Sequence, residues 1–278
     1  MKIGICAPSA AFSRIDADRV IALAAAEYPS AELCFHDQCF LESGHFAGSD
    51  AERLAAFVEL ANDPSIDAIW FARGGYGAGR IAANAVRGLG DTARDKIYLG
   101  YSDGGFLLAA LYRDGIGRPA HGPVVADIRR TDGEDAVRRA LDYLVHGDAA
   151  AIEPHIETGQ KYAAFNLMTL AMMTGTPLLP DLSGHVLMVE EVSEYLYAFD
   201  RAMGNVTSYF APLGLTGIML GRVSDIPEND RPFGEDAESI TRRYCGDAGI
   251  AYLGRADIGH DASNKIVPFG LAPVETAP

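Results

Sequence analysis

The stretch Lys96-Ile-Tyr-Leu-Gly-Tyr-Ser-Asp-Gly-Gly-Phe-Leu-Leu-Ala-Ala-Leu-Tyr112 decides the fold class of this chain. Residues 96–100 form a short apolar run that is typical of a buried strand. Residues 106–112 follow it almost at once with an apolar pattern that is typical of a helix. A strand that runs directly into a helix predicts one unit of an α/β sheet.

The same order of strand and helix recurs on the N-terminal side of this stretch. Strands are predicted at residues 2–7, 32–35 and 67–72, and helices at residues 16–28 and 49–61. Ser49 or Asp50 is placed to cap the second helix, and Glu52 lies in its first turn. Repeated units of this kind predict a Rossmann-like or flavodoxin-like N-terminal domain, with helices on both faces of a parallel sheet.

The pattern changes at residues 148–160, which contain a proline and show no clear period. We therefore predict an N-terminal domain at residues 1–150, a linker at 151–160 and a smaller C-terminal α/β domain at 161–278. In the C-terminal part, helices are predicted at residues 165–174, 200–214 and 236–245, and strands at 186–192, 217–220 and 251–253.

Composition and charge narrow the class of protein. The 278 residues are 49% hydrophobic, which is enough for one large or two medium domains. The net charge of -15 argues against nucleic acid and anionic membranes as partners. The N-terminal apolar run is short and ends at Pro8, and no apolar stretch of about 20 residues follows. We expect a soluble cytoplasmic protein. Its four cysteines contain no CxxC pair and are expected to be free thiols, with a disulfide or a metal-binding pair as the alternative.

Gly100-Tyr-Ser102-Asp-Gly104 is a G-x-S-x-G pattern at the turn between the predicted strand and helix. A sharp turn at this point lifts the serine off the end of the sheet, and small flanking residues permit the turn. The N–H groups at the start of the helix can then hold a developing oxyanion. The alternative interpretation is that Ser102 merely caps the helix.

A nucleophilic serine needs a base and an acid that orients the base. The chain has seven histidines, and spacing alone does not choose among candidates such as His121, His185 and His260. The acids are clearer, because an apolar strand ends at Glu190 and Glu191. Strand alternation points these two carboxylates to opposite faces, so one can reach a site while the other stays in water. Alternatively, both are exposed charges at a strand end.

A glycine-rich turn, Ala72-Arg-Gly-Gly-Tyr-Gly-Ala-Gly-Arg80, follows another predicted strand. It lacks the G-K-[ST] of a phosphate-binding loop and the third glycine of the dinucleotide fingerprint, so nucleotide binding is disfavoured. Gly75 can supply a second oxyanion donor opposite Ser102. Arg73 and Gly74 are candidates for substrate binding. Arg73 or Arg80 can pair either with a substrate carboxylate or, equally well, with a structural acid.

Several short motifs occur in a fixed order along the chain. They are Arg73-Gly-Gly-Tyr-Gly77, Gly100-Tyr-Ser-Asp103, His121-Gly-Pro123, Asn166-Leu with Gly175-Thr-Pro177, Glu190-Glu191 before Tyr197-x-x-Asp-Arg201, and Gly259-His260 ahead of Pro268-x-Gly270. Together they resemble the L,D-carboxypeptidase family of serine peptidases, which includes muramoyltetrapeptide carboxypeptidases and microcin-immunity peptidases. The resemblance extends over nearly the whole chain.

The resemblance implies a catalytic triad of Ser102, Glu190 and His260. With Ser102 as the nucleophile, we expect the backbone N–H groups of Asp103 and of Gly75 or a neighbour to be the oxyanion donors. The resemblance also implies a site between two domains of a homodimeric enzyme that needs no metal or other cofactor. The implied reaction is the release of the terminal D-alanine from cytoplasmic murein tetrapeptides during peptidoglycan recycling. Gly104-Gly105 and Glu191 depart from the residues that the family commonly has, which leaves the substrate preference open.

Three other functions remain as alternatives. A microcin-immunity-like peptidase would use the same triad on an acyl-nucleotide peptide. An α/β-hydrolase esterase shares the G-x-S-x-G pattern, but the HGGG-type loop that it would require is absent from the sequence. A non-catalytic protein could bind a ligand between two α/β domains.

Overall fold

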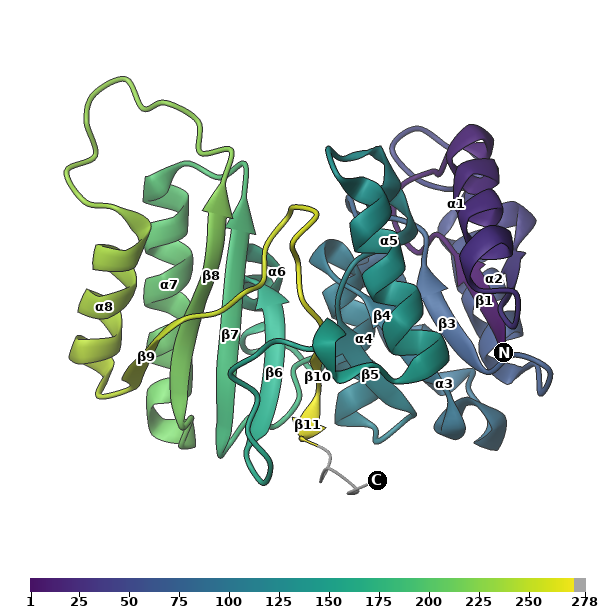
Figure 1. Cartoon of the computed structure of the whole chain (residues 1–278). Helices are drawn as coiled ribbons and strands as arrows, with labels where there is room; N and C mark the ends of the chain where they lie inside the picture. Colours follow the sequence, from purple (N-terminus) through teal and green to yellow (C-terminus); the bar gives the residue numbers. More distant parts are fainter. Residues whose placement is uncertain (273–278) are drawn as a thin grey trace.

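Two β-sheets, each with its own helices, lie side by side in the computed structural model of this chain, which describes residues 1–272 (Figure 1). The first sheet has the strand order β10-β5-β4-β3-β1-β2, and the second has the order β11-β6-β7-β8-β9. The α/β fold class predicted from the sequence is confirmed.

The first sheet is parallel except at one edge, where β10 pairs antiparallel with β5. Its strands are β1 (Lys2–Cys6), β2 (Glu32–Phe35), β3 (Ala68–Phe71), β4 (Ile97–Gly100), β5 (Arg118–His121) and β10 (Val267–Pro268). The helices of this half are α1 (Arg14–Glu27), α2 (Asp50–Asn62), α3 (Ala78–Arg87), α4 (Gly105–Arg113) and α5 (Gly133–Leu141). Ser49 caps α2, and its side chain and that of Glu52 form the reciprocal bonds of a capping box.

Helices cover both faces of this sheet because its strands are apolar on both sides. In β3, Ile69 and Phe71 pack into the core that contains α2, α3 and α4. The alternate residues Ala68 and Trp70 pack into the core that contains α1 and α5. All four side chains are buried, as expected for a central parallel strand.

The second sheet is also parallel except at its own edge strand, β11. Its strands are β6 (Lys161–Asn166), β7 (His185–Val192), β8 (Gly217–Ser224), β9 (Ala251–Arg255) and β11 (Gly270–Leu271). Its helices are α6 (Leu167–Met173), α7 (Leu196–Phe210) and α8 (Ala237–Ala248). No helix within residues 1–272 is both long enough and apolar enough to cross a lipid bilayer.

The start of the second sheet differs from the prediction. The helix predicted at residues 165–174 begins only at Leu167, and the preceding strand β6 was missed. Two alanines in this strand weaken its sequence signal, because alanine is depleted in strands. Asn166 ends the strand and caps α6 by accepting a hydrogen bond from the Thr169 N–H.

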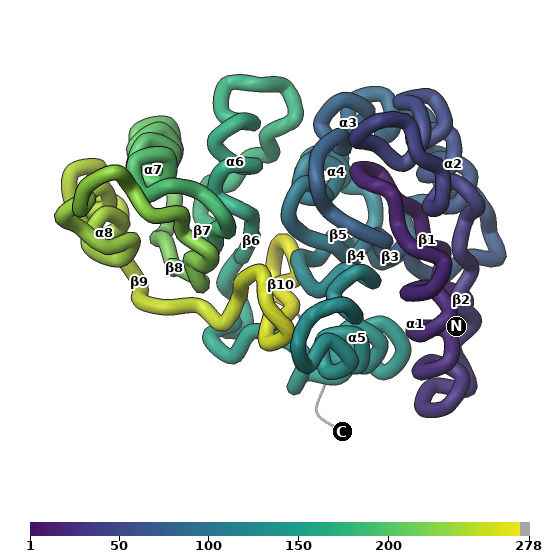
Figure 2. Tube along the Cα trace, turned by 90° about the horizontal axis from the view of Figure 1, so that it is seen from above, coloured from purple at the N-terminus to yellow at the C-terminus, as the bar shows by residue number. Residues whose placement is uncertain are grey.

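The last segment of the chain joins the two sheets. After β9 it returns through residues 256–266, here called the His260 loop, to β10 in the first sheet and β11 in the second. Figure 2 shows this yellow segment passing between the two halves. The division into domains at residues 150 and 160 stays a prediction, and residues 273–278 of the predicted second domain lie outside the described residues.

Gly100, at the end of β4, has no room for a side chain. A Cβ atom there would lie 2.4 Å from Phe71 Cδ2 and 3.1 Å from Phe71 Cβ. We expect Gly100→Ala to lower the free energy of unfolding by about 1–3 kcal/mol, measured by urea denaturation, because Phe71 is fully buried and must move. Gly246→Ala is the matched control, since it adds the same methyl group to open space in α8 and should be neutral or stabilising. Equal stability of the two variants would contradict this account.

Candidate active site

Ser102 occupies a sharp turn between β4 and α4. Its backbone φ of 57° lies in the left-handed region, which few residues other than glycine adopt. A short 3-10 turn at Ser102–Gly104 then leads into α4. The cap of α4 is Gly104, so Ser102 does not have the capping role that was the alternative interpretation. This conformation is typical of a serine that a strained turn presents above a sheet.

The glycine-rich turn after β3 packs directly on Ser102. A Cβ atom at Gly74 would lie 2.9 Å from Ser102 Cβ and 3.0 Å from Ser102 Oγ. Only a residue without a side chain permits this approach. The turn therefore brings its backbone close to Ser102, and the role of Gly75 in this turn as an oxyanion donor stays a prediction.

His260 and Glu190 form a buried pair next to this turn. His260 Nδ1 lies 2.5 Å from Glu190 Oε2, and Glu190 is fully buried on β7. Burial alone would lower the pKa of His260, but the Glu190 carboxylate raises it above its usual 6.5. The carboxylate therefore holds one ring nitrogen and leaves Nε2 for another partner.

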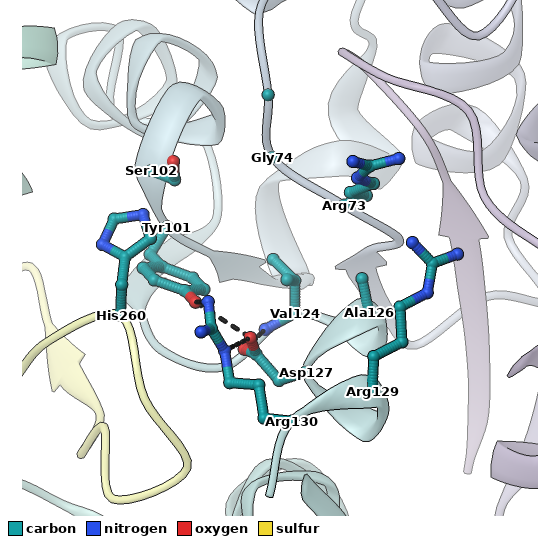
Figure 3. Close-up of a pocket in the computed structure, with 11 residues that line it drawn as sticks. Arg73, Gly74, Tyr101, Ser102, Val124, Ala126, Asp127, Arg129, Arg130 and His260 are labelled. Atoms are coloured by element: carbon teal, nitrogen blue, oxygen red, sulfur yellow. Dashed lines mark hydrogen bonds and ion pairs between the residues drawn. The ribbon is translucent and has the colours of Figure 1, made fainter. Parts of the chain in front are cut away.

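Ser102 and His260 line one cavity of about 300 Å³ at the junction of the two halves (Figure 3). Its wall consists of Arg73, Gly74, Gly75, Tyr101, Ser102, Val124, Ala126, Asp127, Arg129, Arg130 and His260. Within residues 1–272, no hydrogen bond joins Ser102 Oγ to His260. Hydrogen bonds between catalytic groups are often long in ligand-free enzymes and shorten when substrate binds.

The Asp103 side chain does not line this cavity and instead holds the serine turn in place through hydrogen bonds. Its buried carboxylate accepts hydrogen bonds from Ser9 Oγ and from the N–H of Ala78, the latter at 2.8 Å. Burial raises the pKa of Asp103, and the two hydrogen bonds oppose that rise. Asp103 thus ties the serine turn to the first residues of α3 and to the segment after β1, a role that the sequence did not reveal.

The His260 loop is fastened to β8 and to α5. Arg222 of β8 forms ion pairs with Asp257 and Asp261, which flank His260 in the sequence. Arg139 of α5 donates hydrogen bonds to the carbonyl groups of residues 262 and 264. These contacts limit the movement of His260 relative to both sheets.

Asn264 adds a buried contact within the same loop. Its Oδ1 accepts a hydrogen bond from the N–H of Gly259 at 3.1 Å and lies 3.3 Å from Nε2 of His121. His121 is at the end of β5, and burial lowers its pKa to about 4. His121 is therefore a neutral structural residue that supports the His260 loop.

Tyr101 supports His260 from the other side. The ring centroids of Tyr101 and His260 are 4.7 Å apart. The Tyr101 hydroxyl donates to Asp127 Oδ1 at 2.9 Å, and Arg130 Nε donates to the same oxygen at 2.7 Å. The only sequence signal for this network was the position of Tyr101 beside Ser102, because Asp127 and Arg130 lie in a turn without a recognisable pattern.

The expectation that one of the two acids at the end of β7 stays in water is wrong. Glu191 is buried, and its carboxylate accepts hydrogen bonds from Asn166 Nδ2 at 2.6 Å and from the N–H of Met168 at 2.8 Å. Burial raises its pKa to about 7. Alternation does separate the two side chains, but the N-terminus of α6 covers the face that receives Glu191, where the Met168 N–H and the Asn166 side chain donate to it.

A second cavity, of about 360 Å³, lies on the other side of Ser102. It shares Ser102 and Gly75 with the first cavity and is otherwise lined by Tyr76, Asp103, Phe106, Asn166, Met168, Thr169, Met172, Glu191, Val192 and Glu194. Ser102 therefore lies between two cavities. Among residues 1–272, no group of three or more His, Cys, Asp or Glu side chains is arranged to hold a metal ion.

The two sheets with their helices define an α/β protein that brings a strained serine turn and a buried acid–histidine pair to one cavity. The comparisons give the family. Residues 3–122 match the N-terminal domain of the LD-carboxypeptidases and residues 162–273 match their C-terminal domain, so the chain belongs to the LD-carboxypeptidase family.

Curated relatives agree with this assignment. The murein tetrapeptide carboxypeptidase of Pseudomonas aeruginosa is 27% identical over 252 residues, which are 83% of this chain and 79% of the relative. A probable murein peptide carboxypeptidase of Bacillus subtilis is 28% identical over 248 residues, which are 85% of this chain and 77% of the relative. Both relatives are named as carboxypeptidases of murein peptides.

Solved structures share the fold. The muramoyltetrapeptide carboxypeptidase of Oxalobacter formigenes superimposes with a TM-score of 0.81 at 23% identity, covering 98% of this chain and 96% of the other. The microcin C7 self-immunity protein MccF, in complex with aspartyl sulfamoyl adenosine, gives a TM-score of 0.78 at 17% identity, covering 97% and 91% of the two chains.

Proposed function

We propose that this protein is a serine L,D-carboxypeptidase that releases the terminal D-alanine from murein tetrapeptides. The observation that carries the proposal is one cavity lined by both a strained serine and a histidine that is bound to a buried glutamate. Serine, histidine and acid in this relation form the catalytic unit of many serine hydrolases.

In the proposed mechanism, His260 Nε2 takes the proton of Ser102 Oγ while Ser102 attacks the scissile carbonyl carbon. Glu190 holds the opposite ring nitrogen and stabilises the imidazolium that forms. The imidazolium then protonates the leaving D-alanine amine, and the acyl group stays on Ser102. Water, activated by His260, releases the acyl group in the second half of the reaction.

The proposed oxyanion donors are the N–H groups of Asp103 and Gly75. Asp103 follows the nucleophile, and its side chain is held by Ser9 and by the N–H of Ala78, so its backbone is fixed before substrate arrives. Gly75 lines the cavity next to Ser102, and Gly74 and Arg73 are the proposed substrate-binding residues beside it. Each well-placed donor accounts for about 10²–10³ in kcat.

The proposed setting is murein recycling in the cytoplasm by a homodimer. Size-exclusion chromatography with light scattering tests the homodimer, and fractionation of cells that express the protein tests the location. A second candidate is a microcin-immunity-like peptidase that removes an acyl group from a nucleotide. Its support is the similarity in fold to MccF bound to aspartyl sulfamoyl adenosine.

A substrate comparison tests the proposed function. The purified protein is incubated with a murein tetrapeptide that ends in D-alanine, with the same peptide ending in L-alanine, and with aspartyl sulfamoyl adenosine. We expect release of D-alanine from the first and no L-alanine from the second. Release of aspartate alone would favour the immunity-type activity, and no product from any of the three would favour a ligand-binding protein.

A further inference from the structure

The cavity beside Ser102 has a positive wall in a strongly negative protein. Arg73, Arg129 and Arg130 all line it, although the chain has 38 acidic and 23 basic residues and a net charge of -15. Among residues 1–272, the single acidic side chain that lines this cavity is Asp127. The cavity next to Ser102 and His260 is therefore locally positive, although the chain as a whole is negative. A local positive charge of this kind attracts anions.

The three arginines are not equivalent. Arg130 is held by Asp127 at 2.7 Å and by the Tyr101 hydroxyl at 3.2 Å, in the network that supports His260. The Asp127 carboxylate neutralises its charge, and its side chain helps to hold Tyr101 in place. Arg130 is therefore not the free cation of this wall.

Arg73 and Arg129 each have guanidinium N–H groups that can donate hydrogen bonds to a ligand. Arg73 donates from Nη1 to the carbonyl of Ala11 at 3.0 Å, and within residues 1–272 no carboxylate forms an ion pair with it. Arg129 binds Asp16 through Nε, which leaves its terminal nitrogens for another acceptor. Figure 3 shows the two guanidinium groups near each other, on the side of the cavity away from His260.

The mutual repulsion of these two cations is visible in the pKa of Arg73. Burial lowers it, and the nearby Arg129 charge lowers it further. A half-buried cation beside a second cation is stabilised when an anion binds between them. A carboxylate suits such a position, because guanidinium groups donate paired hydrogen bonds to its two oxygens.

We infer that Arg73 and Arg129 bind the C-terminal carboxylate of the substrate, so that the leaving residue occupies the arginine cavity. This inference rests on the proposed function, since it assigns an orientation to the peptide substrate in the same site. The acyl part of the peptide then extends into the second cavity, on the other side of Ser102. The arrangement favours cleavage of peptides that have a free C-terminus, and Arg129 becomes a specificity residue that the sequence did not indicate.

The first test compares a tetrapeptide that has a free C-terminal carboxylate with the same peptide as its C-terminal amide. We expect Arg73→Gln and Arg129→Gln each to lower kcat/KM for the free acid about 10–100-fold, mainly through KM, because a charged hydrogen-bond partner is lost. Activity on the amide should change little, so the preference for the acid falls. Arg73→Lys and Arg129→Lys should recover part of the loss.

Arg80→Gln is the matched control, because Arg80 pairs with Asp50 and does not line this cavity. It should keep the wild-type preference for the free acid. Thermal unfolding of every variant shows whether the fold is retained. If wild-type protein cleaves the tetrapeptide and both glutamine variants keep the full preference, the inference is wrong and the proposed function stands.

A binding experiment makes the inference independent of turnover. N-acetyl-D-alanine and N-acetyl-D-alaninamide, which represent the leaving residue with and without its charge, are titrated into the wild-type protein and followed by NMR. We expect the acid to bind at least tenfold more tightly than the amide, and the difference to disappear in Arg73→Gln. Equal binding of the two compounds to the wild-type protein would overturn the assignment, even if the tetrapeptide is not cleaved at all.

Discussion

Replacing Ser102 with alanine should reduce the release of D-alanine from a murein tetrapeptide by about 10⁴-fold or more, because the proposed nucleophile is lost. The small remaining rate would come from substrate binding and from the backbone oxyanion donors, which the substitution leaves in place. Alanine keeps the Cβ atom of serine, so the packing of Gly74 against this position is retained. The loss should therefore appear in kcat and not in the stability of the protein.

The measurement is the initial rate of D-alanine release at saturating peptide, with enzyme concentration raised until a residual rate is detected. Ser183→Ala is the matched control, since it makes the same substitution at an exposed serine of a turn outside both cavities. Its rate should equal that of the wild type. If Ser102→Ala kept more than a tenth of the wild-type rate, a serine mechanism at this position would be excluded.

Replacing Glu190 with glutamine should lower kcat by about 10³–10⁴-fold, because the amide no longer fixes the productive tautomer of the histidine. Glu190 Oε2 lies 2.5 Å from His260 Nδ1, and the carboxylate is fully buried. A glutamine in this place can turn its NH₂ group toward Nδ1 and leave the hydrogen on Nε2. That nitrogen could then no longer accept the proton of Ser102.

The same variant should change the pH profile. His260 acts as a base only when neutral, and Glu190 raises its pKa above 6.5. In the wild type, kcat/KM should therefore increase with pH as His260 loses its proton, with a midpoint above 6.5. In Glu190→Gln the midpoint should move to lower pH, because burial, which lowers the pKa of His260, then acts without the opposing carboxylate.

Kinetics from about pH 5 to 9 measure both midpoints. Glu191→Gln is the matched control: it alters an equally buried carboxylate on the next residue that binds Asn166 and not His260. We expect the wild-type midpoint for His260 in that variant. An unchanged midpoint in Glu190→Gln would show that the base is not under the influence of Glu190.

The serine turn could be predicted from the sequence because its signal is local. An apolar run, a G-x-S-x-G pattern and a helical run stand next to each other between residues 96 and 112, and the structure has a strand, a left-handed serine and a helix there. The choice of His260 among seven histidines was different. It depended on a resemblance to a family, since no local pattern tells which histidine a distant glutamate will contact.

The roles of the other residues around Ser102 could not be predicted from the sequence for a related reason. Asp127, Arg129 and Arg130 belong to a short turn that has no period, and they gain their roles only when that turn is placed beside Ser102 by the order of strands in the sheet. The prediction for Glu191 was wrong for a different reason. Alternation within its strand was interpreted correctly, but whether a face is wet or covered depends on what packs against it, here the start of α6.

The connection that His260 makes between the two sheets has a consequence for how the protein is made. The loop that carries it is closed by β10, which begins at Val267 of a 278-residue chain and pairs with a strand completed near residue 121. Domains generally fold as they leave the ribosome, N-terminal part first. The serine turn can therefore form before residues 256–268 are translated, so the proposed pairing of Ser102 with His260 is completed only after that segment has emerged.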